Sequence, residues 1–281
     1  MSFEIAIMGA SDMVRAADWA AAEGWNPGLR EGLAFQAADP AGFLVGRLDG
    51  VPVGCVSVVR YGADFGFLGF YIMTPPARGQ GYGIRLWDAG LKHLAGRTVG
   101  LDGVPAQQDN YRKSGFALAW RNLRYQGTPR PSQEKVAGLT VVDARDLPFD
   151  RLAAYDRHFF RNPRDAFLAL WIALPGHVAL AALRDGALEG FGVLRPCRDG
   201  FKIGPLYAAS PAIAAALASA LCAHAGGATV ALDVPEPNRQ AVALAESLGL
   251  VPSFETARMY AGAAPPIDLA GLYGITSFEL G

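Results

Sequence analysis

The chain has 281 residues, of which 51% are hydrophobic and 18% are charged, and its formal net charge at pH 7 is −1. This length and composition predict two folded domains with large apolar cores, and they exclude disorder along most of the sequence. Because the charges nearly balance and no basic run occurs, we expect no binding to nucleic acid or to an acidic membrane surface.

The predicted elements of the first half alternate between strands and helices. Strands are predicted at 3–8, 42–48, 51–60, 65–73 and 98–102, helices at 11–23, 28–38, 82–95 and 106–114, and a final pair of strands through Tyr125. Asp49-Gly50 is a dipeptide typical of a two-residue hairpin turn. Since hairpins make neighbouring strands antiparallel, we expect a mixed sheet with helices on both faces, in the α/β (α+β) class.

A glycine-rich turn, residues 78–83 (RGQGYG), lies between the predicted strand 65–73 and the predicted helix 82–95. Glycines let the backbone approach a ligand closely, and a helix start offers unpaired N–H donors and the positive end of the helix dipole. The turn therefore predicts a seat for a phosphate or pyrophosphate group.

Three kinds of phosphate-binding turn were compared with this segment. A nucleotide P-loop needs Lys followed by Ser or Thr after the glycines, and none is present. A dinucleotide fingerprint needs its third glycine one position after Gly83, and residues 74–77 separate the strand from the turn. The pattern Arg78-x-x-Gly81-x-Gly83 resembles the acetyl-CoA signature of the GNAT superfamily of N-acetyltransferases. A glycine-rich loop without a ligand is the alternative.

The resemblance implies acetyl-CoA as the acyl donor. In similar enzymes the end of the strand offers main-chain groups to the pantetheine arm, and the amides of the turn take the pyrophosphate. The residues so implied are Ile72, Met73, Thr74, Arg78, Gly79, Gln80, Gly81, Tyr82, Gly83 and Ile84. For Arg78, a solvated turn residue is the alternative.

Tyr111 and Asp102 are the candidate catalytic residues. Tyr111 begins a Y-x-K-x-G-F segment, which matches the one whose tyrosine approaches the CoA sulfur in these enzymes; a core tyrosine is the alternative. Many family members have Asn where this chain has Val104. Asp102, at the predicted end of a strand, is the first candidate for the general base and Asp64 the second, and either could equally be an acid in a turn.

The loop between the first two predicted helices is expected to contact the acceptor. It contains Trp25 and Asn26, and in enzymes of this fold this loop usually walls the acceptor site. Trp25 could stack on an acceptor and Asn26 could hydrogen-bond to it. The alternative is a rigid turn, because Asn-Pro is ordinary turn chemistry.

The second half repeats the first at an offset of roughly 135 residues. Residues 67–69 recur as 202–204, and residues 101–102 recur as 232–233. Residues 127–132 have the composition of a linker. With the resemblance, this predicts two tandem GNAT-like αβα domains, at 1–129 and 136–281, each with a mixed, mostly antiparallel sheet.

The second copy departs from the first at the glycine turn. Ser210-Pro211 begins the equivalent helix as a cap followed by proline at the first helical position. We therefore predict that the domain at 136–281 has lost the CoA site and closes the other side of the groove. The apolar run 166–183 is broken at Pro175-Gly176 and predicts a buried helix and a strand, so we expect no membrane span. The tail 273–281 alternates like a strand and is expected to be packed.

The cysteines favour a reducing compartment. Cys55, Cys197 and Cys222 are odd in number and have no C-x-x-C spacing, so we expect a cytoplasmic protein without a metal site. The residues and the resemblance together imply an N-acetyltransferase that moves acetyl from acetyl-CoA to a primary amine, of a small molecule, by direct attack. Two alternatives stay open: a CoA-binding sensor or scaffold without turnover, and an acyltransferase with a different acyl group or acceptor.

Overall fold

The computed structural model describes residues 2–130 and 136–281. The elements of the first half are β1 (Phe3–Ile7), α1 (Ala10–Ala22), α2 (Gly32–Ala38), β2 (Phe43–Leu48), β3 (Val51–Tyr61), β4 (Phe65–Met73), α3 (Tyr82–His93), β5 (Thr98–Gly103), α4 (Gln108–Lys113) and β6 (Phe116–Gly127). Short 3-10 turns precede α3 and α4. The predicted order of elements is confirmed for this half, apart from the corrections given below.

The second half follows the same order. Its elements are β7 (Leu139–Asp143), α5 (Phe149–Asp156), α6 (Asp165–Ala173), β8 (Val178–Arg184), β9 (Ala187–Pro196), β10 (Phe201–Ala208), α7 (Pro211–Ala223), β11 (Val230–Pro235), α8 (Arg239–Ser247), β12 (Val251–Ala261) and a short β13 (Leu272–Gly274). The predicted repeat is therefore present in the fold. The predicted hairpin turn has two residues at positive φ, Asp49 and Gly50, as a type I′ turn requires. The equivalent turn of the second half, Asp185 and Gly186, has the same geometry.

All the strands belong to one continuous sheet. Its order is β1-β2-β3-β4-β5-β12-β6-β11-β10-β9-β8-β7, and β13 pairs with β10 off this path. The pairs β4–β5 and β10–β11 are parallel, and the other pairs are antiparallel. The predicted mixed, mostly antiparallel sheet is thus confirmed, as one sheet that runs through both halves.

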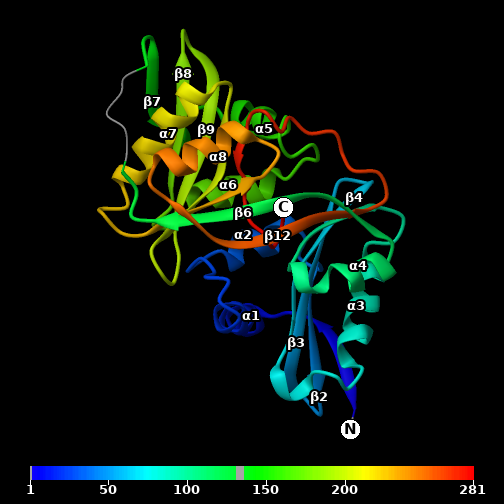
Figure 1. Ribbon diagram of the computed structural model, residues 1–281. Helices are drawn as coiled ribbons and strands as arrows, with labels where there is room; N and C mark the ends of the chain where they lie inside the picture. The colour runs from blue at the N-terminus through cyan, green and yellow to red at the C-terminus, as the bar shows by residue number, and fades with distance from the viewer. Residues whose placement is uncertain (1, 131–135) are drawn as a thin grey trace.

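The two halves exchange their last long strands. β6, from the first half, pairs with β11 of the second, and β12, from the second half, pairs with β5 of the first. β6 and β12 also pair with each other along most of their length. In Figure 1 the first half lies at the bottom and the second at the top, with β6 and β12 crossing side by side between them. Each half therefore completes the sheet of the other.

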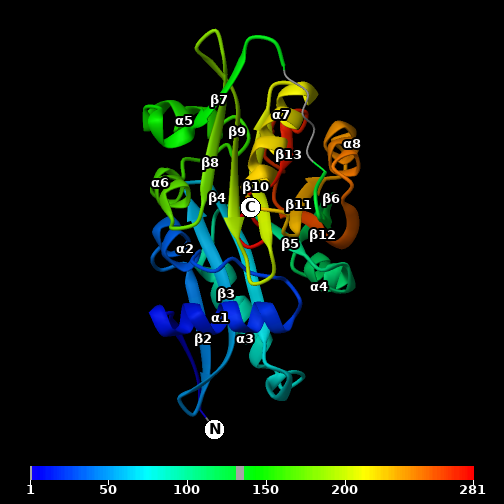
Figure 2. The same cartoon turned by 90° about the vertical axis from the view of Figure 1, so that its left-hand side faces the viewer.

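The apolar core follows this exchange. One cluster lies under α3 and α4, another under α7 and α8, and the largest joins the two halves through α2 and α6. Figure 2 shows α2 beside α6 on one flank of the sheet, and the two helices are in contact. In this shared cluster Phe35 of α2 stacks on Trp171 of α6, with ring centroids 6.0 Å apart.

Three local expectations need correction. The helix predicted at 28–38 begins only at Gly32, because residues 27–29 hydrogen-bond to the β9–β10 turn of the second half. The predicted final pair of strands is one strand, β6, since its partners come from the other half. The tail is packed, but only residues 272–274 form a strand. Of the predicted linker, residues 131 and 132 lie outside the described residues.

Candidate functional site

A cavity of about 640 Å³ lies at the point where β4 and β5 separate. Their parallel pairing runs from Phe65 opposite Thr98 to Leu68 opposite Leu101 and then stops, although β4 continues to Met73. The strand end that no longer pairs with β5 therefore borders the cavity, as do the glycine turn, α4 and part of the second half.

A bulge in β4 produces this separation. The register between β3 and β4 shifts after the pair Ser57–Gly69, so that β4 holds an extra residue before Ile72. Phe70 in this bulge has φ of 45°, which is an unfavourable backbone angle for a bulky side chain. Bulges re-aim side chains and end pairing, and they are frequent beside active sites. Ile72 and Met73, two of the predicted cofactor residues, line the cavity directly after it; Thr74 is not part of the lining.

The glycine turn is open to solvent at the mouth of this cavity. Gly79 and Gly81 have φ of 74° and 82°, and a Cβ atom added at either would meet nothing within 4 Å. Gly83 has a different role, because a Cβ there would lie 2.8 Å from the Tyr71 hydroxyl. Gly83 thus lets the first turn of α3 pack closely on β4.

The start of α3 has unpaired donors. Its N-cap is Gly81, which has no side chain to cap the helix, and no hydrogen bond from the amides of residues 79–84 occurs within the described part of the chain. The equivalent helix α7 is capped instead, because the Ser210 hydroxyl accepts from the amide of Ile213 at 3.4 Å. An anion can therefore bind at α3 through main-chain donors, whereas at α7 the serine occupies that place.

Arg78 fixes the glycine turn to its surroundings. Its Nε donates to the carbonyl of Met73 at 2.9 Å, and its guanidinium forms an ion pair with Glu23 at the end of α1. The side chain remains half exposed and lines the cavity. It holds β4, α1 and the turn together at the cavity mouth and places a positive charge there.

Tyr111 of α4 also lines the cavity. Its ring stacks on Trp87 at 5.6 Å, and it packs against the backbone of Gly103, where a Cβ atom would lie 2.2 Å from the tyrosine ring. Burial, and to a lesser degree Tyr71, raises the pKa of its phenol to about 12. No hydrogen bond of its hydroxyl is found among the described residues, so a protonated phenol is held with its proton available to a ligand.

Asp102 lines the same cavity, but its carboxylate is already engaged. Arg258 of β12 donates to its two oxygens at 2.9 and 2.7 Å, and Asn122 of β6 donates at 2.7 Å. Burial raises the pKa of Asp102, whereas Arg258 and Asn122 oppose that rise. The structure brings Asp102 to the cavity wall as one partner of a buried ion pair.

Two of the predicted cofactor residues, Gln80 and Tyr82, do not line the cavity. Of the predicted acceptor-site residues, Trp25 does. Asn26 does not: its amide donates to the carbonyl of Asp199 at 2.8 Å and accepts from the Asp199 amide at 2.9 Å. Asp64 is also remote, with its carboxylate accepting from Asn162 at 2.9 Å.

Four residues of the second half complete the cavity, and the sequence reasoning missed them individually. They are Phe254 and Thr256 of β12, and Phe278 and Glu279 of the tail. The expectation that the second half closes the groove is thereby confirmed. No local motif marks these residues, because only the strand exchange and the path of the tail bring them to the first half.

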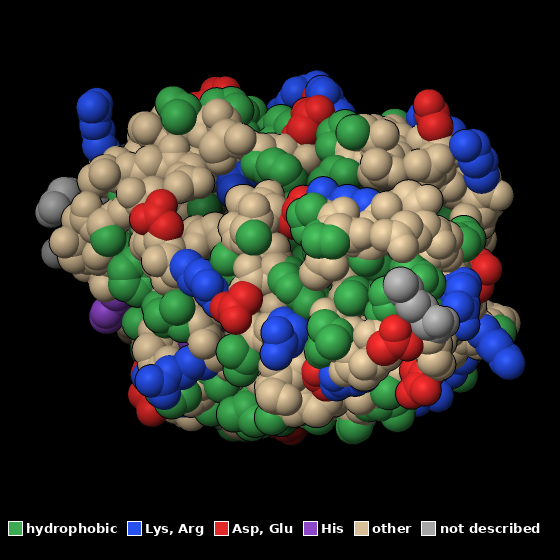
Figure 3. Space-filling model, turned by 90° about the horizontal axis from the view of Figure 1, so that it is seen from below, with side chains coloured by type: hydrophobic (Ala, Val, Ile, Leu, Met, Phe, Trp, Pro, Cys, Tyr) green, Lys and Arg blue, Asp and Glu red, His purple; other side chains and the backbone are tan. Residues whose placement is uncertain are grey.

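The described residues contain no group of three His, Cys, Asp or Glu side chains placed to hold a metal ion. All three cysteines are buried, and burial raises the pKa of each thiol. Within residues 2–130 and 136–281, none of the helices has both the length and the apolar character that crossing a membrane requires. Figure 3 shows acidic and basic side chains interspersed on the face seen from below.

Comparison with known proteins gives matches for both halves. Residues 12–116 match the model of the acetyltransferase (GNAT) family, and residues 152–274 match that of an acetyltransferase (GNAT) domain. A holothin acyltransferase of Pseudoalteromonas sp. (strain SANK 73390) is 34% identical over 266 residues, which cover 94% of this chain and 90% of that protein.

Solved structures share the fold over nearly the whole chain. A candidate acetyltransferase from Pyrococcus horikoshii has a TM-score of 0.80 at 24% identity, with 99% of this chain and 96% of that chain covered. A tandem GNAT protein from the clavulanic acid biosynthesis pathway has a TM-score of 0.62 at 16% identity, with 94% and 100% covered. These two likenesses concern the fold.

Proposed function

Because this chain belongs to the GNAT family of acyltransferases and carries two of its domains in tandem, we propose that it transfers acetyl from acetyl-CoA to a primary amine of a small molecule. One observation carries the proposal. The uncapped glycine turn before α3 and the protonated Tyr111 open onto one cavity, at the point where β4 leaves β5.

The acyl donor would be held by the chain of the first half. The main-chain amides of residues 79–84 are free to take a pyrophosphate, and Arg78 adds positive charge beside them. The unpaired end of β4, at Ile72 and Met73, offers main-chain groups along the cavity. The bound thioester supplies an acyl group activated for attack by an amine, and fixing it beside the acceptor lowers the entropic barrier to reaction.

Tyr111 would supply the proton that the departing sulfur needs. A thiol has a pKa near 8.5 in water, and the phenol of Tyr111, with a pKa of about 12, keeps its proton at neutral pH. Burial raises the pKa of a thiol in this cavity as it does that of the phenol, so Tyr111 can donate to a thiolate that forms there, and the phenolate is then reprotonated by solvent.

The general base predicted from the sequence, Asp102, is held in a buried ion pair. A base must accept a proton from the substrate, but both oxygens of Asp102 already accept from Arg258, and Asn122 occupies a further site on one of them. We therefore assign Asp102 to the support of the cavity wall.

The domain assignment follows from the same geometry. We propose that residues 1–129 bind acetyl-CoA, and that residues 136–281, in which Ser210 caps α7, wall the acceptor side without binding CoA themselves. The exchange of β6 and β12 makes the two parts interdependent, so neither is expected to work alone.

Two measurements on the purified full chain test the proposal. A thermal-shift series with acetyl-CoA and longer acyl-CoA thioesters is expected to show stabilisation of about 2.7 kcal/mol at a hundredfold excess over the dissociation constant. Release of CoA thiol with a panel of amines then tests turnover. The panel should include holothin, because the relative that matches nearly the whole chain is named a holothin acyltransferase.

The outcomes separate the alternatives. Stabilisation by acetyl-CoA without thiol release from any amine would favour a sensor or scaffold. Faster release from a longer acyl thioester than from acetyl-CoA would favour a different acyl group. Absence of any stabilisation by CoA thioesters would exclude the proposed function.

A further inference from the structure

The C-terminal tail crosses from the second half to the first over two equivalent glycines. A Cβ atom added at Gly204 of β10 would lie 2.6 Å from the carbonyl oxygens of Ile275 and Thr276. One added at Gly69 of β4, the repeat equivalent of Gly204, would lie 2.2 Å from the carbonyl oxygen of Glu279. The absence of a side chain at both positions lets the tail lie directly on the sheet, and it brings Glu279 to the cavity of the first half.

Hydrogen bonds from both halves fix this part of the tail. In the first half, Ser57 donates to the carbonyl of Glu279 at 3.2 Å, and the Tyr61 hydroxyl donates to the carbonyl of Leu280 at 3.1 Å. The tail also closes on itself, since the Leu280 amide donates to the Ser277 hydroxyl at 3.1 Å. The position of Glu279 is therefore set by main-chain contacts and does not depend on its carboxylate.

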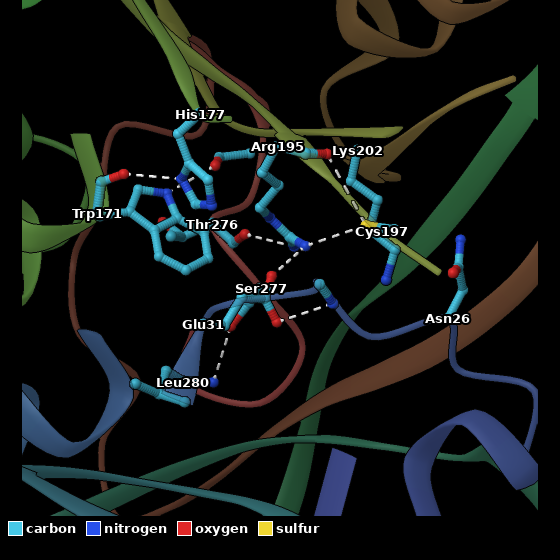
Figure 4. A network of polar contacts seen from close by, with 12 residues as sticks. Asn26, Glu31, Trp171, His177, Arg195, Cys197, Lys202, Thr276, Ser277 and Leu280 are labelled. Carbon is cyan, nitrogen blue, oxygen red and sulfur yellow. Dashed lines mark hydrogen bonds and ion pairs between the residues drawn. The ribbon is translucent and has the colours of Figure 1, made fainter. Parts of the chain in front are cut away.

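Arg195 of the second half binds the part of the tail before Glu279. Arg195 donates to the carbonyl of Thr276 at 3.3 Å and forms an ion pair with Glu31 of the first half at 2.5 Å. Figure 4 shows Arg195 between Thr276 of the tail and Glu31, with Ser277 and Leu280 in the turn below. The tail is thus anchored on both sides of the cavity wall.

The Glu279 side chain is the exception in a region where buried acids are paired. Only 5% of the residue is exposed, yet it lines the cavity, and no hydrogen bond or ion pair of its carboxylate occurs among the described residues. Its buried neighbours are all engaged: Glu31 with Arg195, Asp233 with Arg124, and Asp102 with Arg258. Glu279 is therefore a carboxylate whose oxygens are free for a ligand.

Three cations surround this carboxylate and keep it from being an isolated buried charge. They come from three strands, Arg124 from β6, Arg195 from β9 and Lys202 from β10, and each interacts electrostatically with Glu279. Lys202 donates to the carbonyl of Trp25 at 3.0 Å. Burial, and after it Arg124 and Arg195, lowers the pKa of Lys202 to about 8.

A second polar group lies unpaired in the same wall. Thr256 of β12 is only 2% exposed, and its hydroxyl has no hydrogen-bond partner among the described residues. A buried hydroxyl without a partner is costly, unless a ligand or a water satisfies it. Because Thr256 lines the same cavity as Glu279, it offers a second polar group to a ligand bound there.

Aromatic side chains line the same cavity. They are those of Trp25, Phe70, Phe254 and Phe278. The guanidinium of Arg124 lies 4.7 Å from the centre of the Phe278 ring and 5.7 Å from that of Phe254. Arg124 therefore packs against both rings. Flat side chains around one carboxylate and one hydroxyl favour a flat ligand with a single polar end.

We propose that Glu279 is the proton acceptor of the reaction and that, with Thr256 and these aromatic rings, it forms the acceptor site. This inference rests on the proposed function. In the step, the amine nitrogen forms a bond to the acyl carbon while the carbon–sulfur bond breaks. The amine gives one proton to the Glu279 carboxylate, and Tyr111 gives one proton to the sulfur. Solvent then returns the proton from Glu279 to Tyr111, so the products are an amide and CoA thiol.

The surroundings of Glu279 also restrict the class of amine. Arg124, Arg195 and Lys202 place positive charge near the site, so a second cationic group on the acceptor would be repelled. The acceptor class is a small primary monoamine carried on a flat ring. Linear polyamines and lysine-rich peptides fall outside it.

The test compares the variant Glu279→Gln with wild type in two assays. In turnover with acetyl-CoA and tryptamine, aniline or 3-aminopyridine, we expect Glu279→Gln to lower kcat/KM for the amine about a hundredfold, with no change in acetyl-CoA affinity. In calorimetry without turnover, the same amines are titrated into protein saturated with CoA, and we expect the variant to bind them several-fold more weakly. Glu246→Gln, an exposed acid of α8, is the matched control and should behave as wild type.

Thr256→Val provides an independent variant that is expected to fold. It removes an unpaired buried hydroxyl, so Tm should stay level or rise while amine affinity falls. Three results would overturn the inference. The first is equal amine binding by wild type and Glu279→Gln, and the second is that wild type binds none of the three ring amines. The third is that wild type prefers spermidine to the ring amines. Failure of the proposed function is a different result, either no stabilisation by acyl-CoA or no thiol release. Calorimetry still decides the acceptor site in that case, with the amines titrated into protein without CoA if CoA does not bind.

Discussion

Asp102 and Arg258 lie opposite each other on β5 and β12, with a carboxylate oxygen 2.7 Å from the guanidinium. The same relationship recurs between Asp233 of β11 and Arg124 of β6, at 2.6 Å. In each pair the arginine lies on an exchanged strand, β12 or β6. The acid lies on the strand of the other half with which that exchanged strand pairs, β5 or β11. Since only one of the two pairs borders the cavity, the pairs are explained by the exchange of strands.

We predict that Asp102→Asn lowers the free energy of unfolding by roughly 3–5 kcal/mol, because it leaves the buried Arg258 charge without its counterion. Asp233→Asn should cost a similar amount, since Asp233 has the equivalent place and partner. Denaturant unfolding of both variants checks this. Asp143→Asn, which removes an exposed ion pair to Arg145, is the control and should cost less than about 1 kcal/mol. A stable Asp102→Asn protein with abolished turnover would instead restore Asp102 as the base.

Gly81→Ala should weaken acyl-CoA binding about tenfold or more. The new methyl group would lie in the open space before α3, at φ of 82°, where the proposed pyrophosphate binds. Gly96→Ala is a matched control, because Gly96 has φ of 79°, also has nothing within 4 Å of an added Cβ, and lies beyond the other end of α3. Both substitutions should cost about 1 kcal/mol of stability through backbone strain. Isothermal calorimetry with acetyl-CoA separates the two, and equal affinities would argue against the glycine turn as the binding site.

Tyr111→Phe should lower kcat about a hundredfold without changing acetyl-CoA affinity, because the ring packing on Trp87 is kept and only the proton donor is lost. The pKa of the phenol, about 12, means that its acid form persists as pH rises until that value is approached. The wild-type rate should therefore show no loss from ionisation of Tyr111 below about pH 11. Tyr155→Phe, in α5 of the second half, serves as the control. Undiminished turnover by Tyr111→Phe would remove the tyrosine from the mechanism.

His177 should make the protein lose stability in mild acid. Burial, and then the nearby Arg195, lowers the pKa of His177 to about 4, and its Nδ1 lies 2.8 Å from the carbonyl of Trp171. As pH falls, the unfolded chain binds a proton near pH 6.5, whereas the folded chain resists until about pH 4. Stability is thus fully present above 6.5 and declines by roughly 3 kcal/mol across this window.

Urea unfolding at a series of pH values measures this slope. His177→Gln should flatten it between pH 6.5 and 4, because glutamine does not titrate there. His224→Gln, which changes an exposed histidine just after α7, should leave the slope as in wild type. An unchanged slope in His177→Gln would show that other groups cause the acid sensitivity.

The features that the sequence predicted correctly are those decided within a few residues. The Asp-Gly hairpins have both residues at positive φ, which these residue types tolerate. The glycine turn leaves α3 uncapped, and Ser210 caps α7 through its own hydroxyl. Backbone angles and hydrogen bonds over three or four residues settle such features, so the order of elements, the repeat and the serine cap of α7 could be read from the chain.

Contacts over long distances in the sequence explain the rest. In the sheet, β12 lies beside β5 and β6 lies beside β11. No local sequence pattern predicts that these two strands are exchanged between the halves. Asn26 was predicted at the acceptor site, but its amide pairs with Asp199 in the other half. Glu279 lies more than two hundred residues from Gly69, against which it packs.

The sequence by itself determined the element types, the tandem repeat and the open helix start, because local stereochemistry dictates them. Only the tertiary structure decided which half completes which sheet, which carboxylate is paired, and which one is free in the cavity. The physical reason is that burial and pairing of charges depend on partners brought together by the exchanged strands and the crossing tail.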